Sequence, residues 1–235
     1  MEGFVFMEGK LHQLATVMEH VQPHVVFHLG PIPVYSTVVN TWIIMALLFL
    51  GVFVATRRLQ FIPRGVQHIL EMLLEFIMGL LEEVAGKEGR KYLPLVATLF
   101  IFILSLNLSW FIPGMKPPTM DLSTTAAFGV TTIILVQLIA IRKKGLKGYI
   151  KHFFSPAPFM FPLNVIEELV KPLSLSLRLF GNMFGEEMVV TILIILVPFF
   201  IPTPIMLLGV IMGLIQAFIF TLLTVTYIAN FLHGH

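Results

Sequence analysis

Apolar residues fill long stretches of this chain, and short segments rich in charge or proline separate them. Several stretches reach the roughly 20 residues that a helix needs to cross about 30 Å of hydrocarbon. The pattern predicts an all-α polytopic membrane protein with about five transmembrane helices in a single membrane domain, 1–235. The expected spans follow an external N-terminal segment, 1–35, and cover 36–56, 93–112, 122–141, 159–197 and 203–232.

Residues 65–85 follow a different pattern, in which apolar positions at helical spacing alternate with charged ones. The apolar positions are Leu70, Leu73, Leu74, Ile77 and Leu81. The positions that interrupt them are His68, Glu71, Glu75, Glu82 and Glu83. This periodicity predicts an amphipathic helix that lies at the membrane interface or lines the bundle.

The composition agrees with a membrane protein. Hydrophobic residues make up 57% of the chain and charged residues only 12%, which is more apolar surface than a soluble domain can bury. No cysteine is present, so disulfides and thiolate metal sites are excluded, and we expect neither a metal nor a cofactor. The N-terminal "MEGFVFMEGKLHQ" lacks the apolar core and cleavage site of a signal peptide.

Basic residues predict the orientation, because they concentrate on the cytoplasmic side of membrane proteins. The loop at 113–121 has only Lys116, and the loop at 198–204 has no basic residue. Positive charge follows the first and third spans instead, at Arg57, Arg58, Arg64, Arg142, Lys143, Lys144, Lys147 and Lys151. We therefore expect the N-terminus outside, the C-terminus inside and the amphipathic helix on the cytoplasmic face.

The apolar region 159–197 is too long for a simple crossing. As a helix it would measure about 58 Å, roughly twice the hydrocarbon thickness. It must tilt strongly, bend at Pro162 or Pro172, or run partly along the surface. With 203–232 it is expected to form a long, strongly tilted hairpin.

One stripe of this long helix combines charge, amide and glycine. Ser174, Arg178 and Asn182 follow at steps of four, and Gly181 and Gly185 lie close to the same stripe. The segment "GNMFG" is a small-xxx-small pattern, which lets a second helix approach closely.

The last span repeats this pattern. Gly209 and Gly213 form another small-xxx-small pair, and Gln216 returns to the face of Gly209. A hairpin with its turn centred at residue 197 would place Arg178 and Gln216 level. Asn182 and Gln216 could then both hold the arginine in position.

Several interpretations of the arginine stay open at this point. A guanidinium stays ionised, but it can snorkel to an interface or pair with an acid of its own chain. Glu186 and Glu187 lie eight and nine positions further on, too far for an easy pair within the helix.

A transporter working alone would often show an internal repeat, and none is visible. An intramembrane enzyme is disfavoured, because HExxH, GxSxG and paired aspartates are absent and "GLLEEVAGKE" has the wrong spacing for a phosphate loop.

Three motifs carry a family resemblance: "KPLSLSLRLFGNMFGEE" (171–187), "LIQAFIFTLLTVTYIA" (214–229) and "PPTMDLSTTAA" (117–127). They closely resemble the a-subunit family of the bacterial F-type ATP synthases, and the likeness extends from residue 24 to the C-terminus. The resemblance implies a stator in the bacterial plasma membrane that is not catalytic alone. It would couple H+ flow through two offset half-channels to rotation of a c-subunit ring and ATP synthesis. The implied partners are that ring, the b-subunit peripheral stalk, the remaining synthase subunits and membrane lipid, with no nucleic acid and no directly bound nucleotide.

The resemblance also implies roles for particular residues. Arg178 would be the essential cation facing the ring, with Asn182 and Gln216 beside it and Ser174 in support. The outer half-channel would use Glu187, with Glu186, Asn107 and Asp121 as further polar positions. The inner half-channel would be bordered by Glu167 and Glu168, with Glu71, Glu75 and His68 as more distant candidates. Relatives from enterobacteria have a histidine where this chain has Gly209, so Glu186 or water is expected to replace it.

The expected chemistry explains why an arginine is needed. A ring carboxylate must be protonated while it crosses lipid, because an ionised one costs several kcal/mol or more there. A nearby guanidinium favours release of that proton by lowering the carboxylate pKa by about 1–3 units. Unlike lysine, arginine does not deprotonate, so it also stops protons from passing directly between the half-channels. The sequence does not determine whether the coupling ion is H+ or Na+, and H+ is taken as the default.

Overall fold

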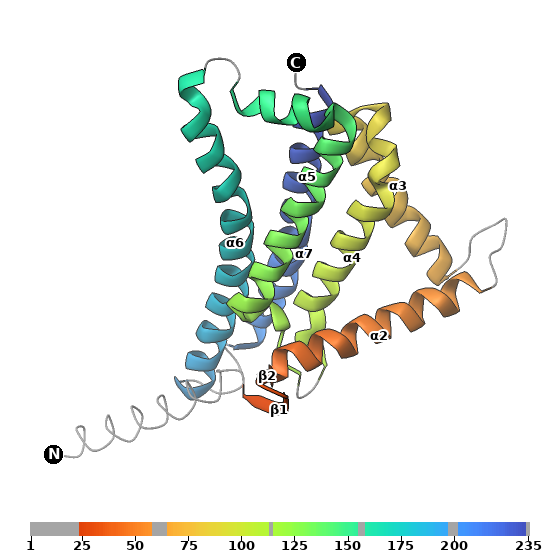
Figure 1. Cartoon of the computed structure of the whole chain (residues 1–235). Coiled ribbons are helices and arrows are strands. Elements are labelled where there is room, and N and C mark those ends of the chain that lie inside the picture. The colour runs from red at the N-terminus through yellow and green to blue at the C-terminus, as the bar shows by residue number, and fades with distance from the viewer. Residues whose placement is uncertain (1–23, 58–64, 113–114, 155–157, 197–201, 234–235) are drawn as a thin grey trace.

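The computed structural model describes residues 24–57, 65–112, 115–154, 158–196 and 202–233 (Figure 1). Most of these residues are helical, and the expected all-α polytopic class is confirmed. The long helices are α2 (Ser36–Thr56), α3 (Val66–Ala85), α4 (Leu93–Leu108), α5 (Leu122–Phe153), α6 (Phe161–Leu196) and α7 (Pro202–His233). Short 3₁₀ helices connect them at Lys87–Tyr92, Ser109–Phe111, Pro118–Met120 and Pro158–Met160.

Four helical stretches among the described residues are long and apolar enough to cross a membrane. They are Ser36–Thr56, Lys87–Phe111, Leu122–Ile150 and Pro204–Leu232. The 36-residue α6 would measure about 54 Å, but it carries charged residues along its length. The number of five crossings and the strong tilt of the last hairpin therefore stay predictions.

A small β-hairpin precedes α2 and was not expected from the sequence. Strands β1 (Val25–Leu29) and β2 (Ile32–Tyr35) pair antiparallel, and the chain turns at Gly30 with a φ of 64°. The hairpin lies at the end of the bundle opposite the last turns of α7 (Figure 1).

The start of α2 is bonded to the segment before α5. The Thr37 hydroxyl donates to Asp121 Oδ2 at 2.7 Å, and the Asn40 amide donates to the Lys116 carbonyl at 3.1 Å. The two segments expected outside the membrane therefore lie at the same end of the bundle. Arg58, Arg64 and residues 1–23 and 198–201, used in the sequence argument, lie outside the described residues.

The core of the bundle is built by α3 to α7. Its side chains include Ile77, Leu81, Phe100, Ile103, Val136, Leu175, Leu179 and Phe220. Of the apolar positions expected from its periodicity, Ile77 and Leu81 are buried and Leu74 is exposed, and α3 packs against α4 and α7. These contacts are compatible with both placements of 65–85, so its position relative to the membrane interface stays a prediction.

Helix α5 continues beyond the expected end of its span at residue 141. It turns at Gly145, whose φ of 69° is accessible to glycine at little cost, and its last residues lie across the end of the bundle (Figure 1). Lys143 forms an ion pair with Glu88, and the Lys144 ammonium lies 5.9 Å from the centre of the Phe231 ring. Part of the basic segment is thereby fixed beside the end of α7.

Helices α5 and α6 meet closely at Gly129. The Ser176 hydroxyl donates to the Pro172 carbonyl at 2.7 Å, and both atoms lie directly against Gly129. A Cβ at position 129 would be 2.6 Å from the Pro172 carbonyl oxygen and would overlap the Ser176 hydroxyl. This contact therefore fixes the part of α6 that precedes Arg178.

Replacing Gly129 with alanine is expected to destabilise the protein by about 1–3 kcal/mol, because the backbone of α6 must move away. The measurement is thermal unfolding of the purified protein in detergent. Gly51→Ala is the matched control, since an added Cβ at Gly51 meets open space and alanine is the better helix former. Equal unfolding temperatures for the two variants would contradict this account of the α5–α6 contact.

Candidate functional site

Arg178 lies on the exposed side of α6. Leu175 and Leu179, which flank it along the helix, are buried in the core with exposed fractions of 1% and 0%. The arginine forms neither a hydrogen bond nor an ion pair with the part of the chain that the structure describes. Its charge therefore faces away from the bundle without an acid from the described chain to neutralise it.

The glycines near Arg178 line the same exposed face. A side chain added at Gly181 or Gly185 would meet no atom within 4 Å. The small-xxx-small pattern is therefore not used for packing among the described helices. Exposed apolar side chains extend this face in both directions, at Leu169, Leu173, Leu177, Val189 and Ile192.

Asn182 and Gln216 join α6 to α7, whereas the hairpin centred at residue 197 was expected to place Gln216 level with Arg178, one turn earlier. The Asn182 amide donates to Gln216 Oε1 at 2.5 Å, one turn beyond Arg178. Gln216 is 1% exposed, and its Nε2 is buried without a partner among the described residues. The sequence midpoint between Asn182 and Gln216 is residue 199, two positions beyond the turn centre predicted at residue 197.

Asn107 of α4 extends this polar layer. Its amide donates to the Gly213 carbonyl at 3.1 Å, and its Oδ1 is buried without a partner in the described chain. A Cβ at position 213 would lie 3.2 Å from the Asn107 Cβ, so glycine allows α4 and α7 to approach. The layer thus crosses the bundle from α4 through α7 to α6.

Glu186 occupies the space beside Gly209. The Glu186 carboxyl group lies where a Cβ at position 209 would be, and its Oε1 is buried without a hydrogen-bond partner among the described residues. Position 209 is the one at which enterobacterial relatives have a histidine, and the glycine here makes room for the carboxyl group of Glu186. Glu187 is partly exposed and interacts electrostatically with Lys116, which belongs to the segment expected outside.

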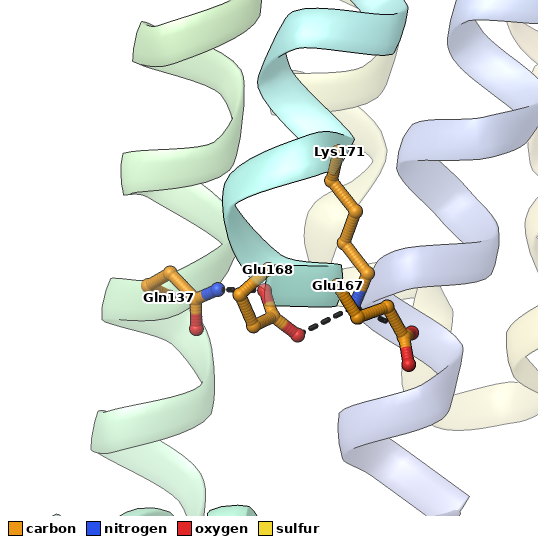
Figure 2. A network of polar contacts seen from close by, with 4 residues as sticks. All are labelled: Gln137, Glu167, Glu168 and Lys171. Carbon is orange, nitrogen blue, oxygen red and sulfur yellow. Dashed lines mark hydrogen bonds and ion pairs between the residues drawn. The ribbon is translucent and has the colours of Figure 1, made fainter. Parts of the chain in front are cut away.

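Near the start of α6, Glu167 and Glu168 surround Lys171 (Figure 2). Glu168 pairs with Lys171 through one oxygen and accepts a hydrogen bond from Gln137 of α5 through the other. Glu167 Oε1 lies 3.4 Å from the Lys171 ammonium, and that ammonium lies 5.3 Å from the centre of the Tyr227 ring. A cavity of 470 Å³ lies beside this cluster and is bordered by Ser174 one turn further along.

Other predicted site residues lie elsewhere. Asp121 caps α5, because its Oδ1 accepts hydrogen bonds from the Ser123 amide at 2.9 Å and the Ser123 hydroxyl at 2.8 Å. Glu71 accepts a hydrogen bond from Gln67 and borders an apolar cavity of 620 Å³ between α2, α3 and α4. His68 and Glu75 are exposed on α3.

Sequence reasoning assigned no role to Lys171, Gln137 or Tyr227. The spacing of Lys171 from the two glutamates, three and four positions away, is a signal that indicates an ion pair on one helix face. Gln137 and Tyr227 come from other helices, so no local pattern marks them.

These features define a class: a polytopic α-helical membrane protein with polar side chains buried between its helices and, on one outer face, a cation that has no ion-pair partner in the described segments. The model of the family described as ATP synthase A chain matches residues 38–229. The chain is 80% identical over 218 residues to ATP synthase subunit a of Moorella thermoacetica, covering 93% of this chain and 100% of that protein. It is 47% identical to ATP synthase subunit a 1 of Pelobacter propionicus, covering 82% and 86%, and 43% identical to ATP synthase subunit a of Geobacter sulfurreducens, also covering 82% and 86%. The chain belongs to the ATP synthase A chain family.

Proposed function

We propose that this chain is the proton-translocating stator subunit of a rotary F-type ATP synthase. It provides two offset half-channels and the cation that faces the carboxylates of a c-subunit ring, and it catalyses no reaction alone. The observation that carries the proposal is the position of Arg178, exposed and unpaired within the described chain, on a helix face with two open glycines.

A permanent charge on an apolar helix face is expensive in a membrane unless an opposite charge approaches it. The described part of the chain supplies no such partner, which argues against a structural ion pair within the subunit. The open glycines provide a flat surface on which a helix of another subunit can pack closely. A ring of helices that bears acids at mid-membrane depth meets both requirements.

Arg178 then acts on each ring acid as it passes. The guanidinium stabilises the ionised carboxylate, so the acid releases its proton to one half-channel. When the ring moves on, the acid must be reprotonated before it enters lipid. Because arginine keeps its own proton, it separates the two half-channels. Asn182 and Gln216, with Ser174 one turn before the arginine, hold polar groups beside this point.

The outer half-channel follows Glu187, Glu186, Asn107 and Gln216. Three of these four carry buried polar atoms without a hydrogen-bond partner in the described chain, and such atoms are the usual partners of internal water. Asp121 accepts a hydrogen bond from Thr37 at the start of α2, at the end of the bundle expected to face the outside. The inner half-channel opens beside Glu167 and Glu168, at the end that holds the C-terminus.

In the membrane, the N-terminus lies outside and the C-terminus lies in the cytoplasm of the bacterial cell. The basic residues after the first and third spans support this orientation. The b-subunit peripheral stalk holds the chain against the ring, and nucleotide is handled by other subunits.

Replacing Glu187 with glutamine is expected to slow proton entry from the outer side by about tenfold or more, because the amide cannot exchange a proton with water. The complex should still assemble, since the side chain is partly exposed. ATP synthesis in reconstituted vesicles, measured as the pH on the outer side is varied, tests this. Glu187→Asp is the control and should retain activity. Wild-type flux in the glutamine variant would exclude Glu187 from the path.

Purification from native membranes tests the proposed function as a whole. A stator subunit should bring with it a c-ring and ATP hydrolase activity. A transporter working alone, the second class considered, would be purified without them. Recovery of the chain free of other subunits, with ion transport intact, would overturn the proposal.

A further inference from the structure

The last residues of α5 form a short segment at the surface of the bundle. Residues 122–141 give about 30 Å of helix, which is enough to cross the hydrocarbon layer. The helix then turns at Gly145, and the residues after it lie across the end of the bundle (Figure 1). We call 146–154 the end segment. Because it follows a membrane-crossing length of helix, it lies at the depth of the membrane interface.

One face of the end segment packs on the neighbouring helices. The centre of the Tyr149 ring lies 6.3 Å from the centre of the Phe231 ring of α7. The Asn164 amide of α6 donates to the Phe153 carbonyl at 2.8 Å. These contacts fix how the end segment is turned about its own axis, so they determine which face is left uncovered.

The uncovered face is an apolar stripe. Leu146, Ile150 and Phe154 follow at steps of four, and they are 62%, 50% and 43% exposed. The stripe continues onto the start of α6, because the Phe154 ring stacks on Phe161 at 4.7 Å between ring centres and Phe159 is 82% exposed. A row of large apolar side chains that the protein leaves open indicates contact with lipid or with another molecule.

Basic residues lie along one edge of this stripe. Five of the ten residues 142–151 are Lys or Arg, and none is acidic. Lys143 is paired with Glu88, but Arg142 and Lys147 are exposed and form no hydrogen bond or ion pair within the part of the chain that the structure describes. Lys147 is three positions before Ile150, which places it beside the stripe on the helix surface. An apolar face with a basic edge is typical of helices that lie on anionic bilayers.

We propose that the end segment is an interfacial helix that binds anionic phospholipid of the adjoining leaflet. The stripe of Leu146, Ile150 and Phe154 enters the boundary of the acyl chains, and Arg142 and Lys147 contact lipid phosphate groups. The inference goes beyond the proposed function, since it requires only that α5 crosses the membrane. No covalent bond changes.

Two observations favour a lipid leaflet over a protein partner. The end segment directly follows a helix that crosses the membrane, so lipid is already beside the stripe. The charge that is left unpaired is positive, and each basic residue near an anionic surface strengthens binding about fivefold. Because Asn164 bonds the end segment to α6, lipid bound here would also hold the start of α6 at a fixed depth.

A single fluorescent label tests both parts of the proposal. The chain has no cysteine, so Ile150→Cys provides one labelling site on the stripe. The labelled full-length chain is placed in vesicles with equal amounts of phosphatidylglycerol, which is anionic, and phosphatidylcholine, which carries no net charge. One lipid or the other carries bromine on its acyl chains, which quenches the label on contact. Brominated phosphatidylglycerol should quench more strongly, and added salt should remove the difference.

Arg142→Gln combined with Lys147→Gln should lower this preference about fivefold for each charge removed, toward equal quenching by the two lipids. Both side chains are exposed, so the fold should be unaffected. The matched control is Lys87→Gln combined with Lys91→Gln. It removes the same charge from exposed positions of the 3₁₀ helix after α3 and should keep the preference.

Several results would overturn the inference. Absence of quenching by either lipid at position 150, repeated with a label at Leu146→Cys, would show that the stripe lies outside the bilayer. Equal quenching by the two lipids, or a preference that survives the loss of Arg142 and Lys147, would exclude these residues as phosphate contacts. Quenching that disappears when the labelled chain is assembled into the synthase would show that another subunit covers the stripe.

Discussion

Replacing Arg178 with alanine is expected to abolish proton-driven ATP synthesis while the complex still assembles. Assembly should survive because the side chain makes no hydrogen bond or ion pair with the described helices. Without the guanidinium, a ring acid loses the interaction that favours its ionised form, which is worth about 1–3 pKa units, or roughly 10- to 1,000-fold. The barrier between the two half-channels disappears with it. ATP synthesis by reconstituted vesicles under an imposed proton gradient is the measurement.

Arg178→Lys is the matched control, because it keeps a positive charge at the same place. Coupled synthesis should also fail in this variant, since a lysine in a low-dielectric site can give up its proton and let protons pass. Proton leakage in the absence of ADP would reveal that passage. Near-normal synthesis by the alanine variant would show that the cation is not required. Full recovery by the lysine variant would show that charge alone suffices.

The second large effect is expected from leucine at Gly185 or Gly181. Both positions face open space in the described chain, so the larger side chain should not disturb the fold of the subunit. In the assembled synthase it would stand between α6 and the ring. Overpacking a close contact costs about 1–3 kcal/mol, which corresponds to roughly 5- to 150-fold weaker association. ATP synthesis should fall accordingly, and the purified complex should lose its ring more readily.

Gly79→Leu provides the control for this prediction. Gly79 lies on an exposed part of α3, and an added side chain there also meets open space. The control variant should retain both ring and activity, because α3 is not on the face that carries Arg178. Ring retention and synthesis equal to wild type in Gly185→Leu and Gly181→Leu would mean that no other helix packs on this surface.

Much of the helical framework could be predicted from local sequence. Apolar runs, the amphipathic period of 65–85 and the family motifs predicted an all-α polytopic protein, and the structure and the family match confirm that class. A hairpin centred near the proline-rich turn predicted that Gln216 lies level with Arg178, and the structure pairs Gln216 with Asn182, one helical turn further along α6. The helices could be predicted because residues close in sequence determine them. The level of α7 beside α6 could be predicted to within one helical turn because a single short turn joins the two helices.

Features that depend on contacts between distant segments could not be predicted. The space beside Gly209 is filled by an acid 23 positions earlier in the chain, and only the packing of α6 on α7 shows it. Gln137 reaches Glu168 from another helix, so no spacing marks the pair. The bend of α5 depends on a positive φ at Gly145, and glycine occurs at many positions where the helix stays straight.

The most direct test of the account is an electron cryo-microscopy map of the intact membrane sector. The account predicts that the face of α6 with Arg178, Gly181 and Gly185 packs against a ring of helices. The guanidinium should lie within about 4–6 Å of the path of a ring carboxylate, the range in which opposite charges shift proton affinity. Arg178 directed into lipid headgroups, or paired with an acid of its own chain with no ring helix beside it, would contradict the proposed mechanism.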